Sequence, residues 1–236
     1  MIGFYDYTVI LTYLSMISAT CGIIFCLNNI GHPYIGMFFL LLCGLCDAFD
    51  GKVARTKKNR TPRMKKFGIQ IDSLSDLIAF GVLPACIGIA MMRCGIYYET
   101  LPNTIFFLKL TERALGVKIA FTVTATFYTL AALIRLAYFN VLEEERFEAD
   151  DSAGKFFHGL PVTSAALVFP TVLLCHIVFS MDFTFLYSIL MVAMGILFIS
   201  DIKVKKPTTK DVFVMIAFGA VEAIVLGLIF IFLKNR

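Results

Sequence analysis

Charged residues are scarce in this sequence, and tryptophan is absent. Of the 236 residues, 16% are charged and 59% are hydrophobic, and the mean hydropathy is +0.84. Soluble domains average roughly 45–50% apolar residues, so the composition argues against an ordinary soluble domain. The first apolar run also lacks a preceding basic segment, which argues against a cleaved signal peptide.

The cysteines do not follow the pattern of a disulfide framework. There are seven of them, an odd number, and most lie inside apolar runs. Cys43 and Cys46 form a C-x-x-C pair, but no second pair accompanies them. Buried apolar thiols are therefore favoured over zinc or redox chemistry.

Long apolar runs take up most of the chain. Runs of about 18–20 apolar residues are typical of membrane-spanning helices, and these runs are too continuous for barrel strands. Backbone in lipid must satisfy its own hydrogen bonds, which helices do. The sequence predicts an all-α membrane bundle of about seven spans, within a range of six to eight. The expected spans are residues 7–27, 34–50, 67–92, 112–140, 160–179, 183–200 and 212–233.

The remaining segments are expected to connect the spans, and one isolated acid lies within the last span. We expect a turn within 94–110, which is too interrupted for a span, and a solvated loop over the acidic segment 143–151. Glu222 lies in the middle of the last span. It could bond within the bundle or take part in a subunit contact, and the sequence does not decide between the two.

Basic residues in the connections predict the orientation. Segment 52–66 holds eight Lys and Arg and no acid, and segment 201–211 holds four Lys. The linkers 28–32 and 180–182 hold neither Lys nor Arg. Because cytoplasmic loops are enriched in Lys and Arg, we expect a cytoplasmic N-terminus. Seven spans then place the C-terminal Lys234 and Arg236 on the other side, mildly against that rule.

Four aspartates flank the basic segment 52–66. Asp47 and Asp50 close one apolar run, and Asp72 and Asp76 precede the next. A helical period puts the first pair on one face and the second pair, four residues apart, on another. Two neighbouring helices could therefore direct four carboxylates into one pocket. Carboxylates at a membrane edge more often mark a functional site than a solvated helix end.

Four like charges in one pocket need cations. Hard oxygen ligands suit Mg²⁺, Ca²⁺ or Mn²⁺, and two such ions would balance the four carboxylates and leave positions open for phosphate. Gly51, Ala54 and Gly68 share the same helix faces and would let a ligand approach the backbone closely. Arg55 supplies positive charge for phosphate.

The two halves of this pattern resemble the signature of the CDP-alcohol phosphatidyltransferase family. They read Asp47-x-x-Asp50-Gly51-x-x-Ala54-Arg55 and Gly68-x-x-x-Asp72-x-x-x-Asp76, and the segment between them is longer than is usual in the family. The resemblance implies transfer of a phosphatidyl group from a CDP-linked lipid to an alcohol, with release of CMP. Because spans take up nearly all of the chain, we expect one membrane domain over 1–236. The resemblance implies a six-helix core near 7–200, an extra C-terminal helix near 212–233, and a homodimer.

The same resemblance implies the roles of the signature residues. Asp47, Asp50, Asp72 and Asp76 would hold two divalent cations, Mg²⁺ or Mn²⁺, and Asp76 would also act as general base. Gly51, Ala54 and Gly68 would line the cytidine site, and Arg55 would help to hold the nucleotide. No covalent nucleophile stands within the signature, which favours direct displacement at phosphorus.

Two further segments bear on the acceptor alcohol. Arg135-Leu-Ala-Tyr-Phe-Asn140 and Phe157-His-Gly-Leu-Pro161 resemble segments of the membrane-embedded phosphatidylserine synthases within that family. Serine carries a carboxylate, which Arg135 could bind bidentately while Asn140 bonds the ammonium or carboxylate. Glycerol phosphate or inositol phosphate stay open as acceptors, because the basic segment could bind their phosphate. Its candidate phosphate or lipid contacts are Lys57, Arg60, Arg63 and Lys65.

One function of another class fits the same pattern. Carboxylate clusters in membranes also mark ion pathways, so a divalent-cation transporter is the rival hypothesis. A transporter would place its carboxylates near mid-membrane, often within inverted repeats, and neither feature is apparent here. We therefore expect an enzyme of the cell membrane whose active site faces the cytoplasm, with lipid and serine as partners and no nucleic acid.

Overall fold

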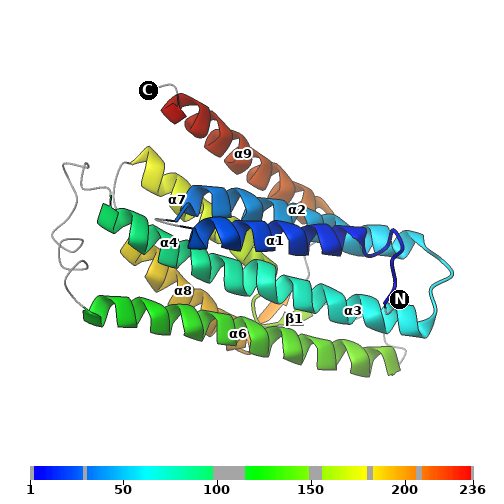
Figure 1. Cartoon of the computed structure of the whole chain (residues 1–236). Helices are drawn as coiled ribbons and strands as arrows, with labels where there is room; N and C mark the ends of the chain where they lie inside the picture. Colours follow the sequence, from blue (N-terminus) through cyan, green and yellow to red (C-terminus); the bar gives the residue numbers. More distant parts are fainter. Residues whose placement is uncertain are drawn as a thin grey trace.

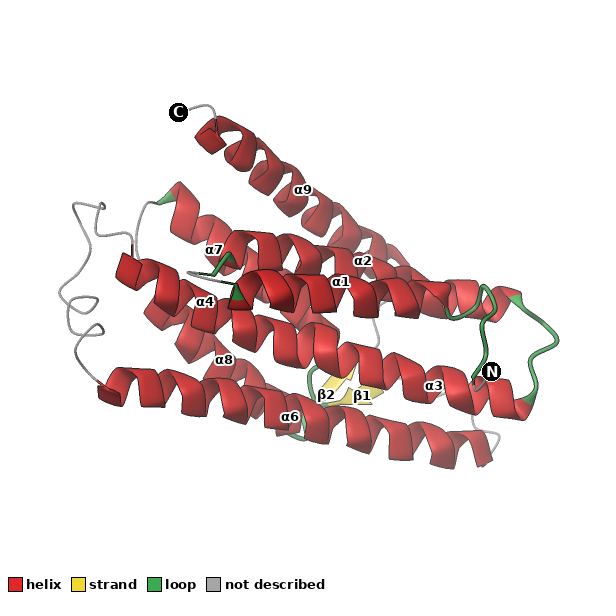
Figure 2. Cartoon of the chain, in the orientation of Figure 1, coloured by secondary structure: helices red, strands yellow, loops and turns green. Residues whose placement is uncertain are grey.

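The computed structural model describes residues 3–28, 31–97, 115–148, 156–179, 183–205 and 209–234. Their dominant feature is a bundle of long helices, with one short pair of strands (Figures 1 and 2). The helices are α1 (Ile10–Leu27), α2 (Pro33–Thr56), α3 (Pro62–Asp76), α4 (Leu83–Tyr97), α6 (Leu115–Glu148), α7 (Ala165–Val178), α8 (Thr184–Ile199) and α9 (Thr209–Lys234). A π-helix, η1 (Leu77–Val82), joins α3 to α4, and a 3₁₀ turn, η2 (Val162–Ser164), leads into α7.

The predicted membrane bundle is confirmed. Four helical segments are long and apolar enough to cross a membrane: Ile10–Leu27, Pro33–Thr56, Pro62–Arg93 and Leu115–Glu145. Three shorter apolar helices are present as well: Val162–His176, Thr184–Ile199 and Phe213–Leu228. The outward faces carry large apolar side chains, such as Val123 and Phe218, as expected for a surface in contact with lipid. The described elements therefore form seven helical rods, because α3, η1 and α4 make one continuous run.

The prediction of a basic loop over 52–66 is wrong for most of its length. α2 continues to Thr56, and α3 begins at Pro62, so residues 57–61 alone connect them. Thr61 caps α3 by accepting a 3.2 Å hydrogen bond from the Met64 amide, and Pro62 suits the first helical turn because no intrahelical bond is lost there. Each half of the aspartate signature thus lies on a helix that extends beyond it.

The predicted loop over 143–151 is also wrong for its first part. α6 continues to Glu148, and Lys66 of α3 donates a 2.7 Å ion-paired hydrogen bond to Glu144. The expected turn within 94–110 falls largely outside the described residues, apart from the end of α4 at Tyr97. The described cysteines are free thiols, as predicted, and Cys43 donates to the Ser15 carbonyl oxygen at 3.3 Å.

The centre of the bundle holds an aromatic cluster. The rings of Tyr128 and Phe169 lie 5.5 Å apart, and those of Phe169 and Tyr187 lie 4.7 Å apart, all three being fully buried. Both phenol groups find acceptors, as buried hydroxyls must: Tyr128 donates to the Phe80 carbonyl at 2.6 Å, and Tyr187 donates to the Pro84 carbonyl at 2.9 Å. The cluster therefore connects α6, α7 and α8 to η1 and to the start of α4.

The two ends of the bundle differ. The start of the described chain lies beside the α2–α3 connection, and α9 ends at the opposite end of the bundle (Figure 1). Strands β1 (Phe156–His158) and β2 (Lys203–Lys205), which the sequence did not predict, pair antiparallel with Phe157 opposite Val204. Gly159 follows β1 with φ of 77°, and a Cβ there would lie 2.8 Å from the Phe198 carbonyl oxygen, so this position requires glycine.

Candidate active site

Three of the four predicted aspartates converge. Asp47 and Asp50 on α2 and Asp72 on α3 each present a carboxylate oxygen, and these oxygens lie within 4.8 Å of one another. The helical period places Asp47 and Asp50 on one face of α2, and α3 directs Asp72 toward that face. The prediction that two helices bring carboxylates into one place is confirmed for these three.

Asp76 lies one helical turn beyond Asp72, at the last residue of α3. It is not part of the group of three, although it is close enough for the other three carboxylates to act on it electrostatically. Its side chain is buried, with 9% of the residue exposed. Asp76 therefore stands beside the cluster of three, one helical turn from Asp72.

One polar side chain of α1, Thr12, contacts the cluster, and α3 bonds to the backbone of the same residue. The Thr12 hydroxyl lies 3.5 Å from Asp50 Oδ2, and Ser75 donates to the Thr12 carbonyl at 3.2 Å. Thr8, Thr12 and Ser15 are all buried. The sequence reasoning missed these residues, yet their spacing along one face of an otherwise apolar span was the available signal.

No basic side chain of the described residues pairs with the clustered carboxylates. Among the described residues, no ion pair involves any of the four aspartates. Three carboxylates this close repel one another unless a cation lies between them, and carboxylate oxygens are the ligands that Mg²⁺ and Mn²⁺ prefer. The donor set therefore fits a divalent cation.

The residues predicted to hold the nucleotide are partly brought together. Gly51 and Arg55 line the same cavity as Asp47, one and two turns further along α2. Ala54 is half-buried on the same helix. Gly68 lies beneath the Arg60 guanidinium, since a Cβ at Gly68 would lie 2.6 Å from Arg60 Nη2. The structure thus brings Arg60 to one of the small residues predicted for the cytidine site.

The other basic residues of the segment differ in what they contact. Lys57 donates a 2.7 Å hydrogen bond to Asp6, so it is engaged by the N-terminal segment rather than by the aspartates. That hydrogen bond, with a further one from Thr8, lowers the pKa of Asp6 to about 2. Arg63 and Lys65 are exposed on the first turn of α3.

The predicted acceptor residues lie on α6. Arg135 is buried, with 6% exposed, and its Nε atom has no hydrogen-bond partner among the described residues. The same atom lies 3.2 Å from where a Cβ of Gly159 would be, so the two segments quoted for the acceptor do meet. Asn140 accepts a 2.7 Å hydrogen bond from Ser73, the residue after Asp72. Asn140 is therefore tied to the aspartate helix, while Arg135 faces the Gly159 turn.

The π-helix begins immediately after Asp76, and the sequence did not indicate it. A π-helix leaves backbone groups without their usual α-helical partners. Here Tyr128 donates to the Phe80 carbonyl, and the Thr129 hydroxyl lies 3.3 Å from the Gly81 carbonyl oxygen. Two side chains of α6 thus stabilise the irregular backbone that follows Asp76.

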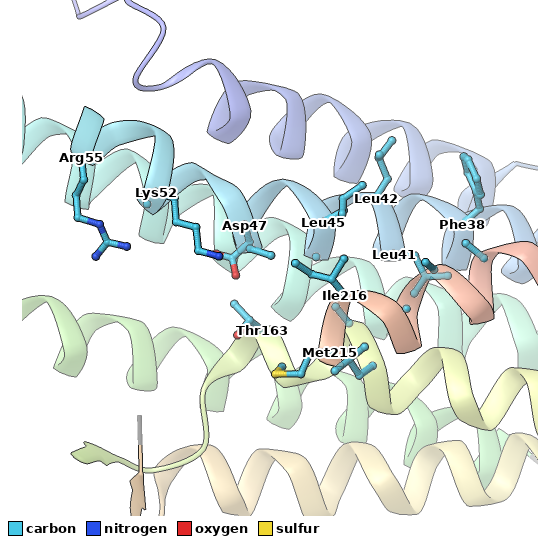
Figure 3. Close-up of a pocket in the computed structure, with 18 residues that line it drawn as sticks. Phe38, Leu41, Leu42, Leu45, Asp47, Lys52, Arg55, Thr163, Met215 and Ile216 are labelled. Carbon is cyan, nitrogen blue, oxygen red and sulfur yellow. The ribbon is translucent and has the colours of Figure 1, made fainter. Parts of the chain in front are cut away.

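A cavity of about 560 Å³ opens beside the cluster, between α2, α7 and α9. Asp47, Lys52, Arg55 and Thr163 give it a polar end, and the remainder of its lining is almost entirely apolar (Figure 3). A charged site that continues into an apolar cavity suits a ligand with a polar head and a hydrocarbon tail.

Comparison with known proteins agrees with this geometry. Residues 8–200 match the sequence model of the CDP-alcohol phosphatidyltransferase family. The chain is 36% identical to a CDP-diacylglycerol–serine O-phosphatidyltransferase of Saccharomyces cerevisiae over 66% of this chain and 50% of the relative. It is 28% identical to the protein of that name from Methanocaldococcus jannaschii, over 90% of this chain and 82% of the relative. It is 30% identical to an archaetidylserine synthase of Methanothermobacter thermautotrophicus, over 80% of this chain and 66% of the relative.

The family match, residues 8–200, covers the whole aspartate signature. The chain belongs to the CDP-alcohol phosphatidyltransferase family, and it is an integral membrane protein of helical fold. The match spans half the length of the yeast relative and most of the length of the Methanocaldococcus relative.

Proposed function

We propose that this chain transfers the phosphatidyl group, or its archaeol counterpart, from a CDP-linked lipid to the hydroxyl of L-serine and releases CMP. The observation that carries the proposal is the convergence of Asp47, Asp50 and Asp72 at the mouth of a cavity with an apolar interior. The names of the relatives support serine as acceptor and a CDP-linked lipid as donor.

Asp47, Asp50, Asp72 and Asp76 would hold two divalent cations, Mg²⁺ or Mn²⁺. When bound, these ions would neutralise the carboxylates and stabilise the charge that shifts onto the departing CMP. Arg55, whose side chain lines the cavity next to Asp47, binds the donor's phosphate groups. Gly51, Ala54 and Gly68 leave room beside the backbone for the cytidine.

Asp76 is the general base. It accepts the proton of the serine hydroxyl as the serine oxygen bonds to phosphorus, and the bond from phosphorus to the CMP oxygen breaks. The electron pair of that bond leaves with CMP, so one displacement completes the transfer. The position of Asp76 beside the three clustered carboxylates supports a role as proton acceptor in addition to that of metal ligand.

Arg135 binds the serine carboxylate. A buried guanidinium whose Nε lacks a partner among the described residues is a costly arrangement without an anion, and a carboxylate supplies one. Asn140, which accepts a hydrogen bond from Ser73 beside Asp72, bonds the acceptor's amino or carboxylate group in this proposal. Of the four basic residues that could bind the phosphate of glycerol phosphate or inositol phosphate, Lys57 is engaged by Asp6.

We further propose that residues 1–236 form one membrane domain with the active site at the cytoplasmic face, and that the protein is a homodimer. Support for the sidedness comes from the basic residues near the α2–α3 connection.

Metal-dependent binding of CDP separates the transferase from the rival cation transporter. The midpoint of heat unfolding of the detergent-solubilised protein should rise when CDP or CDP-lipid is added together with Mg²⁺. It should rise much less with CDP plus a chelator. A rise with Mg²⁺ alone and no further rise with CDP or CDP-lipid would support the transporter instead.

A further inference from the structure

The cavity beside the aspartates is partly built by a helix outside the family's shared segment. Its walls come from α2, α7 and α9, and α9 begins beyond residue 200, where the family match ends. The part of the wall that α9 contributes is therefore a feature that membership in the family does not explain.

The two ends of the cavity differ in chemistry. Asp47, Lys52 and Arg55 lie at one end, and Phe38 and Leu41 lie at the other (Figure 3). The apolar end extends along α2 toward the part of the helix that precedes the signature. An occupant needs an anionic group for the basic side chains and a hydrocarbon chain for the remainder.

Small residues leave the space open. Gly44 and Ala48 of α2 and Gly219 and Ala220 of α9 line the cavity, and a Cβ at Gly44 would lie 2.6 Å from the Ala166 Cβ of α7. A Cβ at Gly219 would meet its nearest neighbours, Leu167 and Leu41, at 3.6 and 3.9 Å, which is ordinary van der Waals contact. The backbone of α9 at Gly219 thus stands at the cavity wall without being packed tightly against α2.

Two contacts hold α9 against α2 and α7 beside the cavity. At the polar end, the Lys52 ammonium lies 5.0 Å from the centre of the Phe213 ring, a cation–π contact between α2 and α9. Further along, the buried Glu222 accepts a 2.7 Å hydrogen bond from Thr171 of α7. This buried hydrogen bond ties α9 to α7 beside the cavity.

We propose that this cavity receives one hydrocarbon chain of the CDP-lipid donor, and that α9 determines which chains fit. The inference rests on the donor class of the proposed function and adds the part of the protein that selects among such donors. A lipid tail is already out of water in the bilayer, so entering the cavity brings no hydrophobic gain. Shape and packing therefore decide the selection.

The test adds a larger side chain to the cavity wall on α9 and compares CDP-lipid donors with long and short hydrocarbon chains. Gly219→Leu adds a side chain at the cavity wall, whereas Gly227→Leu, on the same helix, adds one where no atom lies within 4 Å. The full-length protein in bilayer nanodiscs would be titrated, with Mg²⁺ and serine, with CDP-dipalmitoylglycerol and CDP-dihexanoylglycerol. CMP release gives kcat and KM for each donor. Heat stabilisation by each donor without serine gives binding independently of turnover.

We expect Gly219→Leu to raise the KM for the dipalmitoyl donor roughly five- to hundredfold. This is the fold-change to which the usual cost of overpacking a site corresponds. The dihexanoyl donor should change less than about twofold in the same protein, and Gly227→Leu should match the parent with both donors. If Gly219→Leu fails to fold, Ala220→Leu, at an exposed position of the same wall, serves instead.

Equal behaviour of the parent and the filled variant with the long donor would overturn the inference. Equal loss with both donors would overturn it as well, because the added side chain would then be disturbing the polar end. Donor binding without turnover of serine would contradict the proposed acceptor while leaving the chain selection to be read from stabilisation. Absence of any donor binding by the parent would overturn both proposals.

Discussion

The Tyr128 hydroxyl donates a 2.6 Å hydrogen bond to the carbonyl oxygen of Phe80, four residues after Asp76. The bond reaches from α6 to the π-helix and satisfies a carbonyl that the irregular turn leaves available. Because the π-helix starts at the residue after Asp76, the contact fixes the backbone from which the proposed general base projects.

Tyr128→Phe should therefore slow the reaction more than it weakens substrate binding. Loss of a buried hydrogen bond costs about 1–3 kcal/mol of stability, and a small displacement of a reacting group costs roughly ten- to hundredfold in kcat. Steady-state kinetics and heat unfolding measure the two effects. Tyr187→Phe is the matched control, since its hydroxyl bonds the Pro84 carbonyl beyond the π-helix. Similar losses of kcat in both variants would contradict a positioning role for Tyr128.

The aspartate cluster should respond to charge removal with opposite effects on stability and activity. Asp47→Asn, Asp50→Asn and Asp72→Asn should each lower turnover by roughly a thousandfold or more, and combined variants should lose little further, because the group acts as a unit. In a chelator, each single variant should melt higher than the parent, by roughly 2–4 °C per like-charge contact of about 1 kcal/mol. Near-normal activity of any one variant at saturating Mg²⁺ would contradict the assignment.

Substitution of Arg135 should weaken binding of the acceptor serine rather than of the CDP-lipid donor. Arg135→Lys and Arg135→Ala should raise the KM for serine about ten- to several-hundredfold, because a charged hydrogen bond contributes roughly 1.5–3 kcal/mol. The KM for the CDP-lipid should stay within about twofold. A fall in donor affinity with an unchanged KM for serine would place Arg135 at the nucleotide–lipid site.

The ion pair of Asp6 with Lys57 should give the N-terminal segment a dependence on pH. The pKa of Asp6 is lowered from 3.8 to about 2, so its stabilising contribution is fully present above about pH 4 and is lost as the pH falls toward 2. The difference in melting temperature between the parent and Asp6→Asn should follow that course and shrink at high salt. A difference that stays constant from pH 5 down to about pH 2 would contradict the pairing.

Helical periodicity was enough to predict the meeting of Asp47, Asp50 and Asp72, because charges at those spacings can face only one side of each helix. The periodicity of the signature required helix as far as Ala54, but the membrane span was predicted to end at residue 50, whereas α2 continues to Thr56. Residues 52–56 are too basic to read as membrane span, although Lys and Arg favour helices. The support from Thr12 and Tyr128, and the wall formed by α9, depend on which helices pack together. Sequence spacing does not carry that information.

The most direct test of the proposed function is an acceptor screen with the purified protein, a CDP-lipid and Mg²⁺. CMP release would be measured with serine, glycerol phosphate, inositol phosphate and inositol, each matched against the lipid product formed. We predict that serine alone among them supports release well above background, with one serine phospholipid formed per CMP and no release in chelator. Release supported by glycerol phosphate or inositol phosphate, with none by serine, would contradict the account.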